Sequence, residues 1–201
     1  MARARGLKAP GLFFLRVMGL FKNVLFAAFA ACLLGCAGQV DTVKPASSGL
    51  YIEGVPFFPQ DEYMCGPAAL ASVIGYYGAA AGMKDVAAEV YSEKLKGTLP
   101  MDLLLYAKAK GFEAKFYKGS MNGLKESLTR REPLILFLNL GYSFYPVGHY
   151  IVAVGIDEGA GVVFAHSGTE KEQPFTMKEL ENSWSKTGYS TLLVRPKERP
   201  E

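Results

Sequence analysis

Cysteine and histidine, which supply thiol nucleophiles and imidazole bases, are few in this chain. The 201 residues include three cysteines and two histidines. Cys32 lies within an apolar N-terminal run and Cys36 follows it after one glycine, which leaves Cys65 for the rest of the chain. One thiol with His149 and His166 offers fewer ligands than structural zinc sites use, so we expect no metal and no other cofactor. The set favours nucleophilic catalysis by a thiol that an imidazole assists.

The N-terminal segment has the pattern of an export signal. Five basic residues and no acidic residue precede an apolar run from Val24 to Leu34. The run is shorter than the roughly 20 residues of a transmembrane helix and fits a secretory signal. It ends in Leu33-Leu34-Gly35-Cys36, which resembles the lipobox of bacterial lipoproteins. The resemblance implies cleavage before Cys36 and attachment of lipid to its thiol, which would anchor the protein to a membrane.

This interpretation divides the chain and predicts its location. We expect a signal at 1–35, the lipidated Cys36 and a tether at 36–54, a folded domain at 55–196 and a tail at 197–201. No Asp directly follows Cys36, so the retention signal for the inner membrane is absent. The expected location is therefore the cell envelope, as an exported lipoprotein at the outer membrane that faces the periplasm.

Charge and motifs argue against two classes of partner. Five of the 22 basic residues belong to the signal, which leaves 17 against 19 acidic residues. The basic balance of the whole chain therefore does not indicate nucleic-acid binding. No phosphate-binding loop is present, so no nucleotide is expected.

Cys65 lies at the predicted N-terminus of a buried helix. Pro67 suits a first helical turn, the stretch 68–77 is almost wholly apolar, and Gly78 is typical of a C-terminal end. Free N–H groups and the helix dipole at such an N-terminus favour a thiolate, so we expect a lowered pKa for Cys65. The same N–H groups can hold an oxyanion, and Gln60 could add a donor from its side-chain amide.

His149 begins a run of β-branched residues, HYIVAVGI, which the turn DEGAG ends. A second apolar run, 162–165, leads directly to His166. This pattern predicts a hairpin that brings the two histidines close together across its ladder. His149 could take the proton of Cys65 and return it to a leaving amine.

Together the two segments resemble the C39-like (bacteriocin-processing-peptidase-like) cysteine peptidases of the papain superfamily. The resemblance rests on Gln60, on Cys65-Gly66-Pro67 with AALASVIGYYG after them, and on GHYIVAVGID around His149. It implies that Cys65 is the nucleophile, His149 the general base and Gln60 a donor to the oxyanion. The expected partner is a peptide or protein substrate.

The residue that orients the base departs from the family pattern. Family members place Asp or Asn on the second strand, where this chain has His166-Ser167. Spacing from the base assigns this position to His166, whose neutral ring could accept a hydrogen bond from His149 Nδ1–H. Ser167 stays open, because a one-residue slip or a bulge would exchange the two side chains. Asp157 is assigned to the hairpin turn.

The remaining segments predict an α+β fold. Helices are expected at about 84–91, 100–110 and 123–130, with strands at 113–118, 133–138 and 189–194. Thr176 and Glu179 form a capping box that begins a helix ending near 186. The resemblance implies a papain-like arrangement, in which a helical half with the buried nucleophile helix packs on an antiparallel sheet.

The expected function is a membrane-anchored cysteine peptidase that hydrolyses peptide bonds through an acyl-enzyme on Cys65. Two alternatives stay open. A weak or inactive papain-like domain would bind peptides without cutting them, which the missing Asp supports. An acyltransferase would use the same Cys65 and His149 pair, with an amine as the acceptor.

Overall fold

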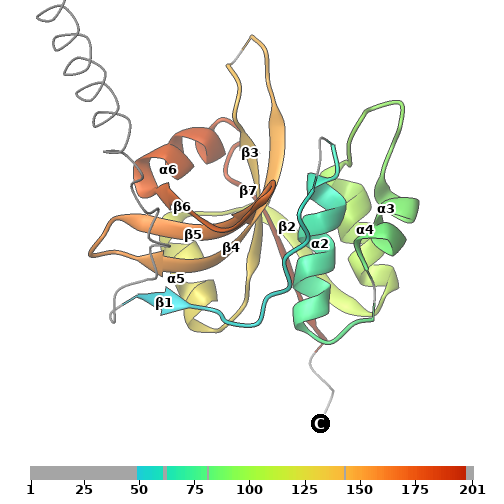
Figure 1. Ribbon diagram of the computed structural model, residues 1–201, viewed down its shortest axis with the longest axis horizontal. Coiled ribbons are helices and arrows are strands. Elements are labelled where there is room, and N and C mark those ends of the chain that lie inside the picture. The colour runs from blue at the N-terminus through green and yellow to red at the C-terminus, as the bar shows by residue number, and fades with distance from the viewer. Residues whose placement is uncertain (1–48, 61–62, 81, 143, 198–201) are drawn as a thin grey trace, which may run out of the picture. The chain divides into compact units, whose positions relative to one another are not determined.

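The computed structural model describes residues 49–60, 63–80, 82–142 and 144–197, and these form an α+β domain (Figure 1). The predicted signal, Cys36 and most of the tail lie outside these residues, so their roles stay predictions. The elements follow the order β1 Leu50–Tyr51, α2 Cys65–Tyr76, α3 Met83–Val90, α4 Pro100–Ala109, β2 Phe112–Lys118, α5 Met121–Thr129, β3 Leu134–Asn139, β4 Gly148–Asp157, β5 Val162–Ser167, β6 Glu170–Thr176, α6 Met177–Ser185 and β7 Ser190–Pro196.

The strands in the described residues form one antiparallel sheet in the order β2-β7-β3-β4-β5-β6, and β1 pairs with β4. Figure 1 shows α2, α3 and α4 gathered on one side of this sheet, apart from α5 and α6. Helix α2 packs against β3 and β4, while α5 and α6 contact β3. The predicted α+β, papain-like class with a helical half and an antiparallel half is confirmed.

Helix α2 is buried because its sequence offers almost no polar face. Nine of its twelve residues are buried, from Gly66 to Ile74. Its one polar residue in that stretch, Ser72, donates its hydroxyl to Ala68 O at 2.8 Å, so no polar group is left unpaired. Apolar burial contributes roughly 25 cal/mol per Å², which makes this helix a main source of the domain's stability.

The predicted helices beyond α2 are confirmed within a few residues as α3, α4, α5 and α6. The capping box before α6 is present: Glu179 N donates to Thr176 Oγ1 at 3.2 Å, and Thr176 N donates to Glu179 Oε2 at 3.1 Å. In the described part of the chain, none of the helices has both the length and the hydropathy of a membrane span.

Two strands were not predicted. Strand β1 falls within the expected tether, and the adjacent Ile52 is only 1% exposed, so the folded part begins before the expected boundary at Val55. Strand β6 reads EKEQPFT, which lacks apolar alternation and contains Pro174. Such a sequence suits a strand at the edge of a sheet, where one side of the backbone forms no ladder.

Candidate active site

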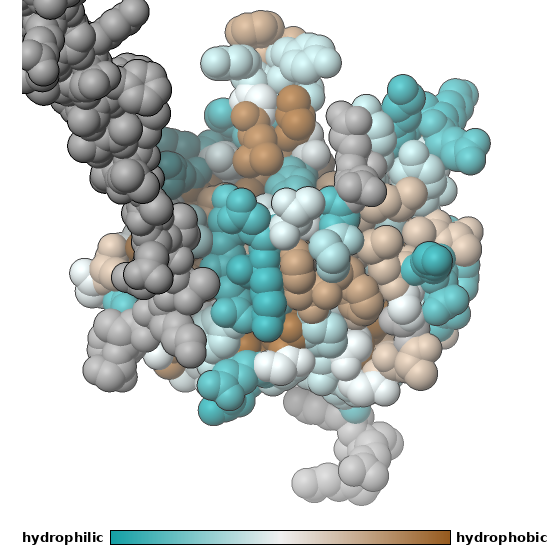
Figure 2. Space-filling model, in the orientation of Figure 1, coloured by the Kyte–Doolittle hydropathy of each residue, from teal (hydrophilic) through white to brown (hydrophobic). Residues whose placement is uncertain are grey.

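A cavity of about 580 Å³ lies where the start of α2, the loop before α4 and the start of β4 meet. Gln60, Cys65 and His149 all line it, so the structure brings together three of the residues selected from the sequence. The β3–β4 hairpin borders the cavity through Leu140 and Val147. Figure 2 shows this hairpin standing clear of the domain, with apolar residues near its base.

Cys65 is the first residue of α2, and its thiol is free. Burial is the largest influence on its pKa and raises it, while backbone N–H groups of Tyr150, Gly66 and Cys65 itself oppose the rise. The expected lowering of the Cys65 pKa is therefore wrong for the substrate-free molecule. Desolvation of the thiolate outweighs the N–H groups of the helix N-terminus.

His149 lies at the second position of β4, and burial lowers its pKa. Its Nε2 lies 3.0 Å from Ser167 Oγ. When Nε2 carries the proton and donates it to that hydroxyl, Nδ1 keeps a free lone pair. The two pKa shifts together favour a neutral thiol and a neutral imidazole at rest, with the imidazole able to accept a proton.

Ser167, rather than His166, lies beside the base, and a β-bulge explains why. The β4–β5 register shifts by one residue at Val154, which has no partner across the ladder. Beyond this bulge His166 pairs with Val152, an odd number of residues from His149. Because side chains alternate between faces, His166 points away from the His149 face and Ser167 points toward it.

His166 has partners elsewhere. Its Nε2 lies 3.1 Å from Val55 O, and its Nδ1 accepts a hydrogen bond from Glu172 N at 3.2 Å. Phe57 meets the ring edge-on, with ring centroids 5.4 Å apart. Because Nδ1 accepts, Nε2 carries the hydrogen and donates it to Val55 O, so the ring is neutral. The structure therefore does not place His166 in the orienting position.

Gln60 lines the cavity and is held by a backbone hydrogen bond. Gln60 N donates to Gly168 O at 3.2 Å. Its side-chain Oε1 is buried and has no hydrogen-bond partner among the described residues. An amide oxygen only accepts hydrogen bonds, so any donation to an oxyanion would come from Nε2 of the same side chain.

The opposite wall of the cavity was missed from the sequence. Leu95 and Leu99 line it, together with Thr98. The O–H of Tyr150 donates to Thr98 O at 3.1 Å, which ties this loop to β4 one residue after the base. Leucine and threonine side chains have no reactive or charged group, so their types in the sequence did not indicate a site.

A metal ion needs several ligand side chains that lie close together. Among the described residues, no group of three or more His, Cys, Asp or Glu side chains is placed to hold a metal ion. Asp157, which the sequence assigned to the hairpin turn, accepts a hydrogen bond from Ala160 N at 3.0 Å through Oδ1.

Comparisons with known proteins identify the family and the fold. Residues 52–192 match the Peptidase_C39 like family. The peptidase domain of ComA from Streptococcus, a bi-functional ABC transporter involved in a quorum-sensing pathway, has a TM-score of 0.60 at 22% identity and covers 72% of this chain and 100% of its own. No curated protein matches the chain.

Two further solved structures share the fold. A double glycine motif protease from an AMS/PCAT transporter, in complex with the leader peptide, has a TM-score of 0.57 at 23% identity and covers 77% of this chain and 99% of its own. The N-terminal peptidase C39 like domain of the toxin secretion ATP-binding protein from Vibrio parahaemolyticus has a TM-score of 0.52 at 16% identity and covers 69% and 99%. At these identities the likeness shows the fold.

Proposed function

Because the chain belongs to the Peptidase_C39 like family, we propose that it is a cysteine peptidase in which Cys65 attacks the substrate and His149 is the general base. The observation that carries the proposal is their shared cavity, which holds a free thiol at a helix N-terminus and an imidazole whose Nε2 lies 3.0 Å from Ser167 Oγ. Nucleophilic thiol catalysis requires this sequence of groups.

In the proposed first step, His149 Nδ1 takes the proton of the Cys65 thiol while the sulfur bonds to the substrate carbonyl carbon. The C=O π electrons move to the oxygen, which becomes an oxyanion. Its donors would be the Gln60 side-chain amide and the backbone N–H of Cys65. Ser167 accepts from His149 Nε2–H throughout, which holds the tautomer with Nδ1 toward the thiol.

The acyl-enzyme forms when the C–N bond breaks and His149 gives its proton to the departing amine. A water then attacks the thioester carbonyl, its proton passes to His149, and the C–S bond breaks with return of that proton to sulfur. Each step reuses the same base and the same oxyanion donors, as general acid–base catalysis requires. We propose that the substrate is a peptide or protein.

Membrane attachment is part of the proposal and rests on the sequence. The lipobox-like Leu33-Leu34-Gly35-Cys36 supports a lipid on Cys36 and a place in the cell envelope. Each buried CH₂ of an acyl chain contributes about 0.8 kcal/mol, so several chains would anchor the protein firmly.

A second candidate has its own support in the geometry. Ser167 stands where a carboxylate would stabilise the imidazolium, and burial favours the neutral thiol. Both features fit a peptide-binding module that cuts slowly or not at all. The position of Gln60 on the wall of the same cavity supports catalysis, because the N–H of its side-chain amide could donate to an oxyanion.

Peptide cleavage by the full-length chain in detergent separates the two candidates. We expect the wild type to cut peptides in a mixed library and Cys65→Ala to leave them intact, with cleavage measured by mass spectrometry. His149→Ala should slow cleavage by at least about 10²-fold, since it removes the general base. Lys178→Ala, on an exposed position of α6, is the matched control and should cut normally. An uncut library whose peptides still protect Cys65 from iodoacetamide would establish the binding module instead.

A further inference from the structure

We propose that His166 is a positioning residue, which clamps the segment 55–60 onto β5 and β6 and so fixes Gln60 in the oxyanion site. The inference rests on the proposed function, because Gln60 has an oxyanion to bind only in that reaction. It gives a role in the reaction to a histidine that does not contact His149.

The clamp joins three separate stretches of chain through one buried ring. His166 is 5% exposed and lies on β5. Its Nε2–H donates to Val55 O at 3.1 Å, and its Nδ1 accepts from Glu172 N on β6 at 3.2 Å. Phe57 closes the remaining side edge-on at 5.4 Å. A ring with a donor on one side and an acceptor on the other can satisfy both backbone groups at once.

The clamp reaches Gln60 through a stiff segment. Val55 and Gln60 lie at its two ends, and Pro56 and Pro59 between them each lock their φ angle. The far end is held directly after β5, because Gln60 N donates to Gly168 O at 3.2 Å, two residues beyond His166. Both ends of the segment are therefore tied to residues 166–168, and a displacement of Val55 would move Gln60.

This arrangement explains how Gln60 keeps its place on the cavity wall, although its side-chain Oε1 is buried without a partner among the described residues. A side chain on a free loop would turn its buried Oε1 toward a donor or toward water, because leaving it unpaired costs about 1–3 kcal/mol. The clamp fixes the backbone at Val55 and at Gln60, so the Gln60 side chain has less freedom to turn away. Positions held within about 0.5 Å are what an oxyanion donor needs to act.

Two probes of Cys65 separate positioning of Gln60 from general damage. Iodoacetamide alkylates the thiolate by direct displacement and forms no oxyanion. A mixture of N-acetyl dipeptide aldehydes adds reversibly: sulfur bonds to the aldehyde carbon, the oxygen becomes an oxyanion and then takes a proton. The full-length chain in detergent is treated with iodoacetamide, with and without the aldehydes, and the Cys65 peptide is quantified by mass spectrometry.

The key variants are His166→Phe, which keeps a ring against Phe57 but loses both hydrogen bonds, and His166→Gln, whose amide can donate and accept as the imidazole does. We expect His166→Phe to raise the aldehyde concentration for half-protection at least about tenfold, and to change alkylation without aldehyde by less than about twofold. His166→Gln should remain within about threefold of the wild type.

The coupling to Gln60 decides the inference. Gln60→Ala should weaken aldehyde protection as His166→Phe does, and the double variant should lose no more than either single variant. The inference would be overturned if the losses of aldehyde protection added up in the double variant. It would also be overturned if His166→Phe slowed alkylation as much as it weakened protection, or if it left protection unchanged. If His166→Phe does not fold by circular dichroism, His166→Met replaces it under the same criteria. A wild type that aldehydes do not protect would instead refute the proposed function, and the clamp with it.

Discussion

The hydroxyl of Ser167 gives the base less support than a carboxylate would. It can accept Nε2–H from His149 at 3.0 Å and so fix the tautomer, but it carries no charge to stabilise the imidazolium. Burial raises the pKa of Cys65 and lowers the pKa of His149. A raised thiol pKa means that the thiolate appears only at higher pH, and a lowered imidazole pKa means that the base stays unprotonated to lower pH. Thiolate reactivity should therefore rise with pH.

Ser167→Asp should change this pH dependence. A carboxylate beside Nε2 raises the pKa of His149, and the resulting imidazolium lowers the pKa of Cys65. We expect alkylation of Cys65 by iodoacetamide at about pH 6 to become at least about tenfold faster. Below the pKa of a thiol, lowering that pKa by about one unit raises the thiolate fraction about tenfold.

The matched control is Thr169→Asp, which adds the same charge at an exposed position two residues further along. Its alkylation profile should follow that of the wild type. An unchanged profile in Ser167→Asp would mean that the hydroxyl does not support His149 in solution.

The sequence predicted Cys65, His149 and Gln60 because each is marked by its immediate neighbours. The choice between His166 and Ser167 depends on a bulge, which local composition does not encode. The bulge at Val154 adjoins Gly155, where a Cβ would lie 2.6 Å from Tyr51 Cδ2. Tyr51 belongs to β1, a strand that the sequence did not predict. The wrong orienting residue and the missed strand thus concern the same place in β4.

At the scale of elements, the site depends on close contact between α2 and the loop before α4. A Cβ on Gly66 would lie 2.8 Å from Thr98 Cβ, closer than real Cβ atoms approach. The loop is closed by the Ser92–Gly97 bridge and held to β4 by the Tyr150 hydroxyl, so it has little freedom to withdraw. Glycine at 66 therefore lets the nucleophile helix reach the cavity wall.

Gly66→Ala should therefore disturb the site through packing. We expect the free energy of unfolding to fall by about 1–3 kcal/mol and Cys65 alkylation to change, as overpacking forces the loop or the helix to move. Chemical denaturation and iodoacetamide kinetics measure the two effects. Thr98→Gly removes the opposing Cβ, so the double variant should recover alkylation.

Gly97→Ala is the control for this pair, because its Cβ would meet only Leu95 O at 3.9 Å. It should leave both measurements near those of the wild type. A Gly66→Ala protein that matched Gly97→Ala would show that α2 and the loop are not in tight contact.

The predicted elements share a property that the missed ones lack. The helices carry caps or continuous apolar faces, such as the Thr176 box and the buried stretch of α2, so short-range interactions define them. Strands β1 and β6 are defined by their partners across the sheet, β4 and β5. Strand β1 pairs with a segment distant in sequence, which leaves no local pattern. Strand β6 pairs with the strand directly before it, but its sequence EKEQPFT lacks the apolar alternation that marks a strand.

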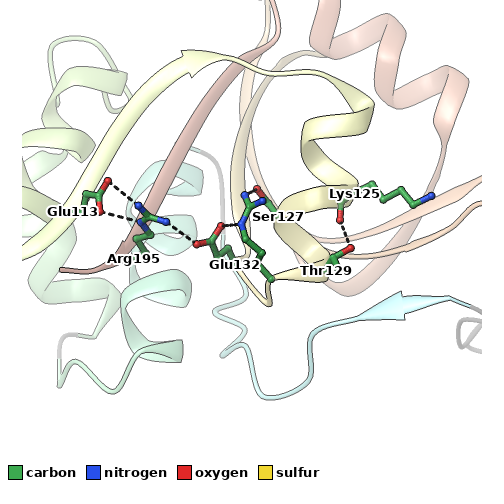
Figure 3. A network of polar contacts seen from close by, with 7 residues as sticks. Glu113, Lys125, Ser127, Thr129, Glu132 and Arg195 are labelled. Carbon is green, nitrogen blue, oxygen red and sulfur yellow. Dashed lines mark hydrogen bonds and ion pairs between the residues drawn. The ribbon is translucent and has the colours of Figure 1, made fainter. Parts of the chain in front are cut away.

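At the scale of the whole domain, a polar network joins the edge strand to the rest of the sheet (Figure 3). Arg195 on β7 binds both carboxylate oxygens of Glu113 on β2, at 3.0 and 3.2 Å. It also donates to Glu132 at 3.1 Å, and Glu132 accepts from Arg130 Nε at 2.9 Å. Glu132 therefore links the end of α5 to the C-terminal strand.

Glu132→Gln tests what this network contributes. The Glu132 side chain is 12% exposed, so water can replace little of what the substitution removes, and two arginines lose their shared carboxylate. We expect the free energy of unfolding in urea to fall by about 1–3 kcal/mol. The pH profile of Cys65 alkylation should not move, because no residue of the network lines the cavity.

Glu89→Gln provides the matched comparison, since Glu89 pairs with Lys110 at 3.1 Å while its side chain is 56% exposed. The free energy of unfolding of that variant should fall by less than about 1 kcal/mol, because exposed ion pairs contribute little to stability. If Glu132→Gln and Glu89→Gln lowered the free energy of unfolding equally, Glu132 would contribute no more than a surface charge. A shift of the Cys65 profile in Glu132→Gln would mean that the sheet edge and the catalytic cavity are coupled. The expected result separates them: the network holds β2 and β7 to the sheet, and the bulge, the clamp and α2 position the reacting groups.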